Sequence, residues 1–98
     1  MTERLALLAQ LEAKSGAGDR LAAVLESARA LAVGETGTVS WHAFRISDTR
    51  FGIFDTFEMD EGRAAHLNGE IPAALGQVAD ELLAAAPDIA PAEIIAVK

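Results

Sequence analysis

The 98-residue sequence contains no cysteine and no tyrosine, and it has a single tryptophan. Without cysteine the chain can form neither disulfide bonds nor thiolate metal sites, and an iron–sulfur centre is excluded. No glycine-rich phosphate loop is present to hold a nucleotide cofactor. No segment approaches the roughly 20 apolar residues that a membrane-spanning helix requires. These absences remove most of the usual routes to redox chemistry.

Basic residues are also scarce. The chain has 8 lysines and arginines against 15 aspartates and glutamates, which gives a net charge of −7. Nucleic acid and anionic membranes both require a positively charged surface, so we expect neither as a partner. His42, His66 and the acidic residues show no tight ligand spacing, and we therefore expect no metal site.

The apolar content is sufficient for one packed domain. Hydrophobic residues make up 51% of the chain, and the length fits a single domain spanning residues 1–98. The apolar run within residues 1–15 is interrupted by polar residues, and no small-residue cleavage site follows it. We therefore expect no signal peptide and a cytoplasmic protein.

Residue periodicity predicts the elements of the first half. Residues 4–13 alternate at period two, which is typical of a strand, although the leucines alone also fit a helix. Asp19 is expected to cap a helix that runs to Val33, because its side chain can accept a free backbone N–H. Residues 38–46 and 50–57 are rich in β-branched and aromatic side chains around a short polar turn, which predicts a β-hairpin.

The second half shows two helical segments and a final strand. Residues 60–67 fit a short helix with acidic residues in its first turn. A second helix is expected to begin near Ile71, where an apolar stripe with helical spacing starts. Pro87 and Pro91 are expected to bracket a loop, and residues 93–98 to form the last strand.

The predicted order is therefore β-α-β-β-α-β, the ferredoxin-like α+β pattern with an antiparallel sheet. Helices in this pattern cover only one face of the sheet, yet Ala6 and Leu8 present apolar side chains to the other face. An uncovered apolar face requires a partner, and a second copy related by two-fold symmetry is the simplest one. We expect a homodimer with a cavity beside each sheet.

The stretch from residue 38 to residue 57 contains the tryptophan and the phenylalanines of the chain. Strand alternation places Trp41 and Arg45 on one face and His42 and Phe44 on the other. Trp41 and His42 therefore cannot both line one cavity, and we favour the face of Trp41 and Arg45. The plainer interpretation is that the aromatic residues form an ordinary core.

The hairpin "GTVSWHAFR…RFGIFDTF" and the following "DEGRAAHLNGEIPAAL" resemble the antibiotic biosynthesis monooxygenase family, in particular its small quinol-monooxygenase-like members. The resemblance covers nearly the whole chain and rests on a pattern of residue types rather than a fixed string. Its most specific pieces are "FDTF" and "AAHL". It implies the dimeric α+β barrel fold, which agrees with the argument from the uncovered face.

The resemblance also implies a chemistry. Characterised members oxidise phenolic or quinol-type aromatic substrates with O2, and some use no cofactor. On this sequence it implies a catalytic group in which His66 is the base, Asp55 orients it or holds a hydroxyl, and Arg45 stabilises an oxyanion. The residues expected to contact the aromatic substrate are Trp41, Phe44 and Asn68.

The sequence departs from the family pattern in two ways. Trp41 stands where relatives often carry a tyrosine, and Asp55 is one methylene shorter than the glutamate that is frequent at its place. A mechanism that relies on a tyrosine hydroxyl is therefore not transferable. The haem-degrading branch uses an asparagine on its first strand, and residues 4–13 contain none, which argues against haem degradation.

Each candidate residue also has a purely structural interpretation. His66 can hydrogen-bond locally, and Arg45 and Asp55 can form an ion pair without a catalytic role. Two functions therefore stay open. One is a cofactor-independent monooxygenase of aromatic substrates, and the other is a non-catalytic dimeric module that binds a small molecule or serves a stress response. The position of His66 and Asp55 relative to the cavity separates them.

Overall fold

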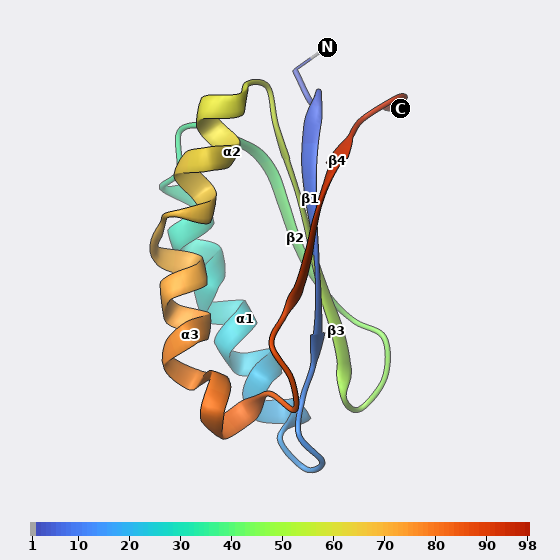
Figure 1. Ribbon diagram of the computed structural model, residues 1–98, viewed down its shortest axis with the longest axis vertical. Helices are drawn as coiled ribbons and strands as arrows, with labels where there is room; N and C mark the ends of the chain where they lie inside the picture. The colour runs from blue at the N-terminus through green and yellow to red at the C-terminus, as the bar shows by residue number, and fades with distance from the viewer. Residues whose placement is uncertain (1) are drawn as a thin grey trace.

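The computed structural model describes residues 2–98, which form four strands and three helices (Figure 1). In chain order these are β1 (Leu5–Glu12), α1 (Gly18–Val33), β2 (Thr38–Arg45), β3 (Arg50–Phe57), α2 (Asp60–Leu67), α3 (Glu70–Leu82) and β4 (Asp88–Glu93). The strands form one antiparallel sheet in the order β2-β3-β1-β4. This is the ferredoxin-like α+β fold that the sequence predicts.

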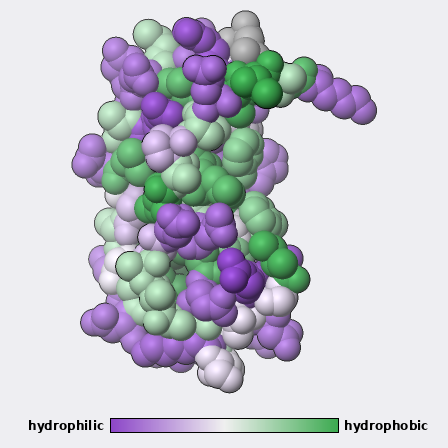
Figure 2. Space-filling view, turned by 45° about the vertical axis from the view of Figure 1, so that its right-hand side comes forward, coloured by the Kyte–Doolittle hydropathy of each residue, from purple (hydrophilic) through white to green (hydrophobic). Residues whose placement is uncertain are grey.

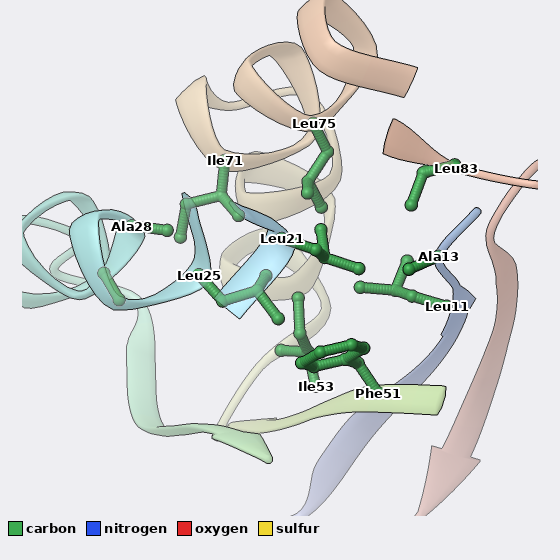
Figure 3. Packing of buried hydrophobic residues seen from close by; sticks show 11 residues of the cluster. Leu11, Ala13, Leu21, Leu25, Ala28, Phe51, Ile53, Ile71, Leu75 and Leu83 are labelled. Carbon is green, nitrogen blue, oxygen red and sulfur yellow. The ribbon is translucent and has the colours of Figure 1, made fainter. Parts of the chain in front are cut away.

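All three helices lie on one face of the sheet (Figure 1). None of them, within residues 2–98, has the length and apolar character needed to cross a bilayer. The core fills the space between the helices and this face (Figure 3). Its larger members are Leu11 from β1, Leu21 and Leu25 from α1, Phe51 and Ile53 from β3, and Ile71 and Leu75 from α3.

The predicted cap at Asp19 is wrong. The N-cap of α1 is Ala17, which makes no side-chain hydrogen bond to the helix, and Asp19 lies within the first turn. A Cβ at Gly18 would meet the backbone carbonyl oxygen of Asp48, so the β2–β3 turn packs directly on the start of the helix. The Asp19 carboxylate instead accepts a hydrogen bond of 2.9 Å from Arg45 Nη1.

The predicted position of the last strand is also wrong. β4 spans Asp88–Glu93, and residues 94–98 lie outside the strands. The Ile94 N–H donates to the Arg4 carbonyl, so Leu7 and Pro91 face each other in a non-hydrogen-bonded pair. The missing N–H of Pro91 therefore faces the open edge, where proline costs no ladder hydrogen bond.

The other face of the sheet carries no helix. Leu8 and Phe54 are half-buried there, and the Phe44 ring lies over Gly52, where an added Cβ would be 2.3 Å from the ring. Ile95, beyond β4, is 89% exposed. The space-filling view shows apolar patches mixed with hydrophilic side chains on the side turned toward the viewer (Figure 2). Apolar surface of this kind on a small domain is typical of an interaction surface.

Candidate functional site

His66, on the inner side of α2, lies between two carboxylates. Its Nε2–H donates to Asp55 Oδ2 at 2.9 Å, and its Nδ1–H donates to Glu35 Oε1 at 2.7 Å. Asp55 and His66 are both buried, and Glu35 is partly buried. The Thr38 hydroxyl donates to the same Glu35 oxygen at 2.6 Å. Three titratable side chains from β3, α2 and the α1–β2 connection thus form one hydrogen-bonded chain.

The fold brings each of these side chains to its place. Asp55 is on the central strand β3, opposite Leu7 of β1 and Trp41 of β2, on the face that the helices cover. His66 is the buried residue of α2, and its ring packs against Phe57 with 5.5 Å between centroids. Because α2 follows β3 after a short turn, its inner face falls directly over the end of β3.

The two carboxylates determine the charge of His66. Burial of the ring opposes protonation, but the hydrogen bonds and the negative charges of Asp55 and Glu35 outweigh burial and raise the pKa of His66 to about 9. At neutral pH the ring is therefore an imidazolium, which donates from both nitrogens. The group then contains two negative charges and one positive charge.

A cavity of about 260 Å³ lies beside this group. Within the described part of the chain, Asp55 and His66 are the only titratable residues that line it, and its other walls are apolar or small: Leu7, Ala9, Ile53, Leu67, Ile71, Pro72, Leu75, Gly76, Ala79, Pro87 and Ile89. These residues come from the helix-covered face of the sheet, from α2 and α3, and from β4 and the segment before it. The cavity is therefore an apolar space with one charged pair in its wall.

Asp55 lines this cavity and has one oxygen without a hydrogen-bond partner. Oδ2 accepts the hydrogen bond from His66, whereas Oδ1 is buried and has no hydrogen-bond partner among residues 2–98. An unsatisfied buried carboxylate oxygen costs free energy, and such atoms in native proteins commonly have a catalytic or binding role. The arrangement can therefore accept a hydrogen bond, or a proton, from a ligand in the cavity.

Glycine at position 76 leaves room in the cavity wall. Gly76 lies within α3, where glycine is the second least favourable residue for a helix, and a Cβ at this position would meet no atom within 4 Å. Pro72, Gly76 and Ala79 share one side of α3 and line the cavity together. The small side chains of this stripe keep the space open.

We predict that two substitutions at Gly76 have different effects, one on folding stability and the other on ligand binding. Gly76→Ala should raise the free energy of unfolding by up to about 1 kcal/mol, since alanine is the better helix former. Gly76→Leu should weaken the binding of any ligand that occupies the cavity by roughly 10–10²-fold, because the ligand would then overpack it. Urea denaturation and calorimetric titration measure the two effects.

The exposed neighbour Gln77, which does not line the cavity, provides the control for this prediction. Gln77→Leu should leave ligand binding in the cavity unchanged. Wild-type affinity in Gly76→Leu would show that the ligand binds elsewhere.

The structure brings His66 and Asp55 together but places Arg45 elsewhere. Arg45 lies at the end of β2, pairs with Asp19, donates to the Ser47 and Asp48 carbonyls, and its guanidinium lies 5.0 Å from the centre of the Phe51 ring. It does not line the apolar cavity. Its contacts hold the β2–β3 turn against α1, so the suggested Arg45–Asp55 ion pair is wrong.

The residues expected to contact the substrate do not lie together at the apolar cavity. Trp41 packs against the core and lines a separate open groove of about 550 Å³ between α1 and β2. Phe44 is on the helix-free face but also reaches that groove, as does His42, which is exposed. Asn68 caps α2 by donating to the Ala64 carbonyl. None of these four residues, Trp41, Phe44, His42 and Asn68, lines the apolar cavity.

Sequence reasoning missed Glu35 and Gly76. Glu35 stands in the connection "GETGT", and nothing in that stretch marks a carboxylate that reaches a histidine 31 positions away. Gly76 had a usable signal, because an isolated glycine inside a helical pattern often has a packing or functional reason. Across residues 2–98, no group of three or more histidine, aspartate or glutamate side chains is arranged to hold a metal ion.

The fold and site define a ferredoxin-like α+β domain with a buried aspartate–histidine–glutamate group at an apolar cavity. The chain is 45% identical to a protein of unknown function from Nitrosomonas europaea, whose crystal structure matches with a TM-score of 0.96 over 99% of this chain and 94% of that one. The chain belongs to the same family as that protein. No protein-family model and no functionally curated protein matches the sequence.

More distant structures share the fold. A candidate antibiotic biosynthesis monooxygenase from Nitrosomonas europaea matches at 11% identity and a TM-score of 0.84, over 94% of this chain and 99% of that one. Another, from Chloroflexus aurantiacus, matches at 18% identity and a TM-score of 0.74, over 97% and 96%. At these identities the match shows a common fold, and the ferredoxin-like α+β fold of the chain is confirmed.

Proposed function

We propose that the protein is a monooxygenase that oxidises a small phenolic or quinol-type substrate with O2 without a bound cofactor. The observation that carries this proposal is Asp55, which lines an apolar cavity and has one buried oxygen, Oδ1, without a partner among residues 2–98. A phenol presents an apolar ring together with one acidic O–H donor, which matches those walls and that acceptor. The fold shared with candidate antibiotic biosynthesis monooxygenases supports the same class of reaction.

The proposed reaction begins with the breaking of a substrate O–H bond. The proton passes to Asp55 Oδ1, and the electron pair stays on the phenolate, which is electron-rich enough to reduce O2. One oxygen atom forms a bond to a ring carbon, the O–O bond then breaks, and the other atom leaves as water. For a quinol the products are a hydroxyquinone and water, so the four electrons that reduce O2 all come from the substrate. The apolar walls of the cavity limit contact of the anion with bulk water.

This assignment reverses the roles expected from sequence. An imidazolium with both nitrogens donating has no lone pair, so His66 is not a free base at neutral pH. Asp55 takes that role in the proposal, and the hydrogen bond from His66 orients its carboxylate. The positive ring also partly neutralises the phenolate as it forms.

The cavity volume limits the substrate. About 260 Å³ lies below the usual range for sites that bind drug-sized molecules, so a substrate of one or two fused rings is favoured. The single polar acceptor selects a ligand that donates a hydrogen bond. A quinone offers only carbonyl oxygens, which the carboxylate repels, so the reduced form should bind more tightly than the oxidised form.

The test is oxygen uptake with a panel of naphthols, hydroquinones, menadiol and anthrone. Turnover of at least one compound at a rate above its spontaneous oxidation is expected, with a product that carries one more oxygen atom and two fewer hydrogen atoms than the substrate. Metal and flavin are added in parallel as controls. Saturable binding with no oxygen consumption across the panel would favour the non-catalytic binding module instead.

We also propose that two copies pack with their helix-free faces together. Leu8 lies near the middle of this face, so Leu8→Glu places two negative charges close to a two-fold axis and should raise the dimer dissociation constant by roughly 10²-fold. Sedimentation velocity at micromolar concentration measures the effect. Val33→Glu, at an exposed position at the end of α1, is the matched control and should leave the dimer intact. A monomeric wild-type protein under these conditions would contradict the proposal.

A further inference from the structure

Glu35 differs from its two partners in exposure. Its side chain is 20% exposed, against 7% for His66 and 2% for Asp55. It lies in the connection between α1 and β2, outside the apolar cavity, and lines a separate surface hollow together with Glu70 of α3. The hydrogen-bonded chain therefore runs from the cavity wall to a partly solvated carboxylate.

A close backbone contact fixes this connection on α2. A Cβ at Gly62 would lie 2.6 Å from the Gly37 carbonyl oxygen, and a Cβ at Gly37 would lie 2.7 Å from the Gly62 Cα. Only two glycines permit this approach, and it holds Glu35 within reach of the ring on the next turn of α2. The Thr38 hydroxyl then orients the Glu35 carboxylate. These backbone and side-chain contacts hold the Glu35 carboxylate in a defined position.

The second carboxylate favours the protonated form of the His66 ring. A neutral ring carries one N–H, so one of the two facing carboxylates would meet a lone pair, and only the protonated ring satisfies both. The charged groups that act on the ring are Asp55 from β3 and Glu35 from the connection, and Glu70 of α3 is the further acid near Glu35. Leu7, opposite Asp55 on β1, carries no charge.

We infer that Glu35 is a positioning residue that holds His66 as an imidazolium and, through it, sets the proton affinity of Asp55. This inference rests on the proposed function for its catalytic meaning, but its charge argument stands on the geometry alone. Before proton uptake the group has a net charge of −1, and after Asp55 is protonated His66 and Glu35 remain as a neutral pair. Without the Glu35 charge, proton uptake would leave an uncompensated cation in a buried place, and Asp55 would be a weaker base.

The first experiment follows the His66 ring nitrogens by ¹⁵N NMR through a pH titration of the full chain without substrate. Glu35→Gln keeps the shape and can still accept from Nδ1, so the ring should stay in place while its pKa falls by at least about one unit. Thr38→Val should also lower the pKa of His66, but by a smaller amount. Glu61→Gln, an exposed acid on the same helix, should not change it. An unchanged pKa in Glu35→Gln would overturn the inference whether or not the protein has enzymatic activity.

The second experiment uses any phenolic substrate that the wild-type protein turns over. Glu35→Gln should lower kcat by roughly 10-fold or more with little change in KM, and should move the acidic limb of the pH–rate profile to lower pH. A purely structural Glu35 would change stability without moving this limb. Absence of turnover in the wild-type protein would refute the proposed function, while the NMR result would still decide the role of Glu35.

Discussion

Replacing Asp55 with asparagine should lower turnover of a phenolic substrate by roughly 10²–10⁴-fold, the usual contribution of a positioned general base. The substitution keeps the shape of the side chain but removes the oxygen that can take a proton at the cavity. Steady-state oxygen uptake at saturating substrate measures the loss. Because Asp55 does not touch the helix-free face, the assembly of the protein should not change.

Asp19→Asn is the matched control for this substitution, since that carboxylate is 94% exposed and pairs with Arg45 far from the cavity. It should keep wild-type turnover. Binding measured without oxygen separates a loss of chemistry from a loss of affinity. The asparagine variant can donate as well as accept, so its preference for a quinol over the corresponding quinone should become smaller. Full activity in Asp55→Asn would show that the base lies elsewhere.

The free energy of unfolding should fall by on the order of 3 kcal/mol as the pH rises from about 6 to about 10. The pKa of His66 is about 9 in the folded protein, above its ordinary value of 6.5. Stabilisation from the extra proton is therefore fully present below pH 6.5 and is lost as the pH rises through 9. Urea unfolding at a series of pH values measures this slope.

His66→Gln should remove most of this pH dependence and should also destabilise the protein at pH 6, because it leaves two buried or half-buried carboxylates without their cation. His42→Gln is the control, since His42 is exposed and should not alter the slope. An equal fall between pH 6 and pH 10 in His66→Gln would assign the effect to other groups.

Local patterns were sufficient for most of the elements. Period-two alternation predicted β1, and helical spacing predicted α1 and α3, because burial of one face imposes these periods on the sequence. Residue composition predicted the hairpin strands β2 and β3, and acidic residues in the first turn predicted α2. The same alternation correctly separated Trp41 from His42, which pair with Asp55 and Phe54 on opposite faces of the sheet. Local patterns failed at β4, where the mostly apolar residues 93–98 suggested a strand more strongly than Asp88–Glu93 did.

Only part of the candidate site could be predicted from the sequence. His66 and Asp55 were named, but from a resemblance, and their contact at 2.9 Å could not be read from positions 11 residues apart. Arg45 was assigned to the site from the resemblance, and strand alternation placed it on the same face as Trp41. Strand alternation fixes the face but not which element covers each end of it, and Arg45 lies at the end covered by the start of α1.

The sequence by itself determined the ferredoxin-like order of elements, the absence of thiol chemistry and the acidic surface, since these follow from composition and local periodicity. Only the tertiary structure decided which side chains meet. The register of β3 against β1, the packing of α2 over β3 and the contact between Gly37 and Gly62 join Asp55, His66 and Glu35. The charge of His66 and the free oxygen of Asp55 depend on distances between residues remote in sequence, because electrostatic and hydrogen-bond energies depend on separation in space rather than along the chain.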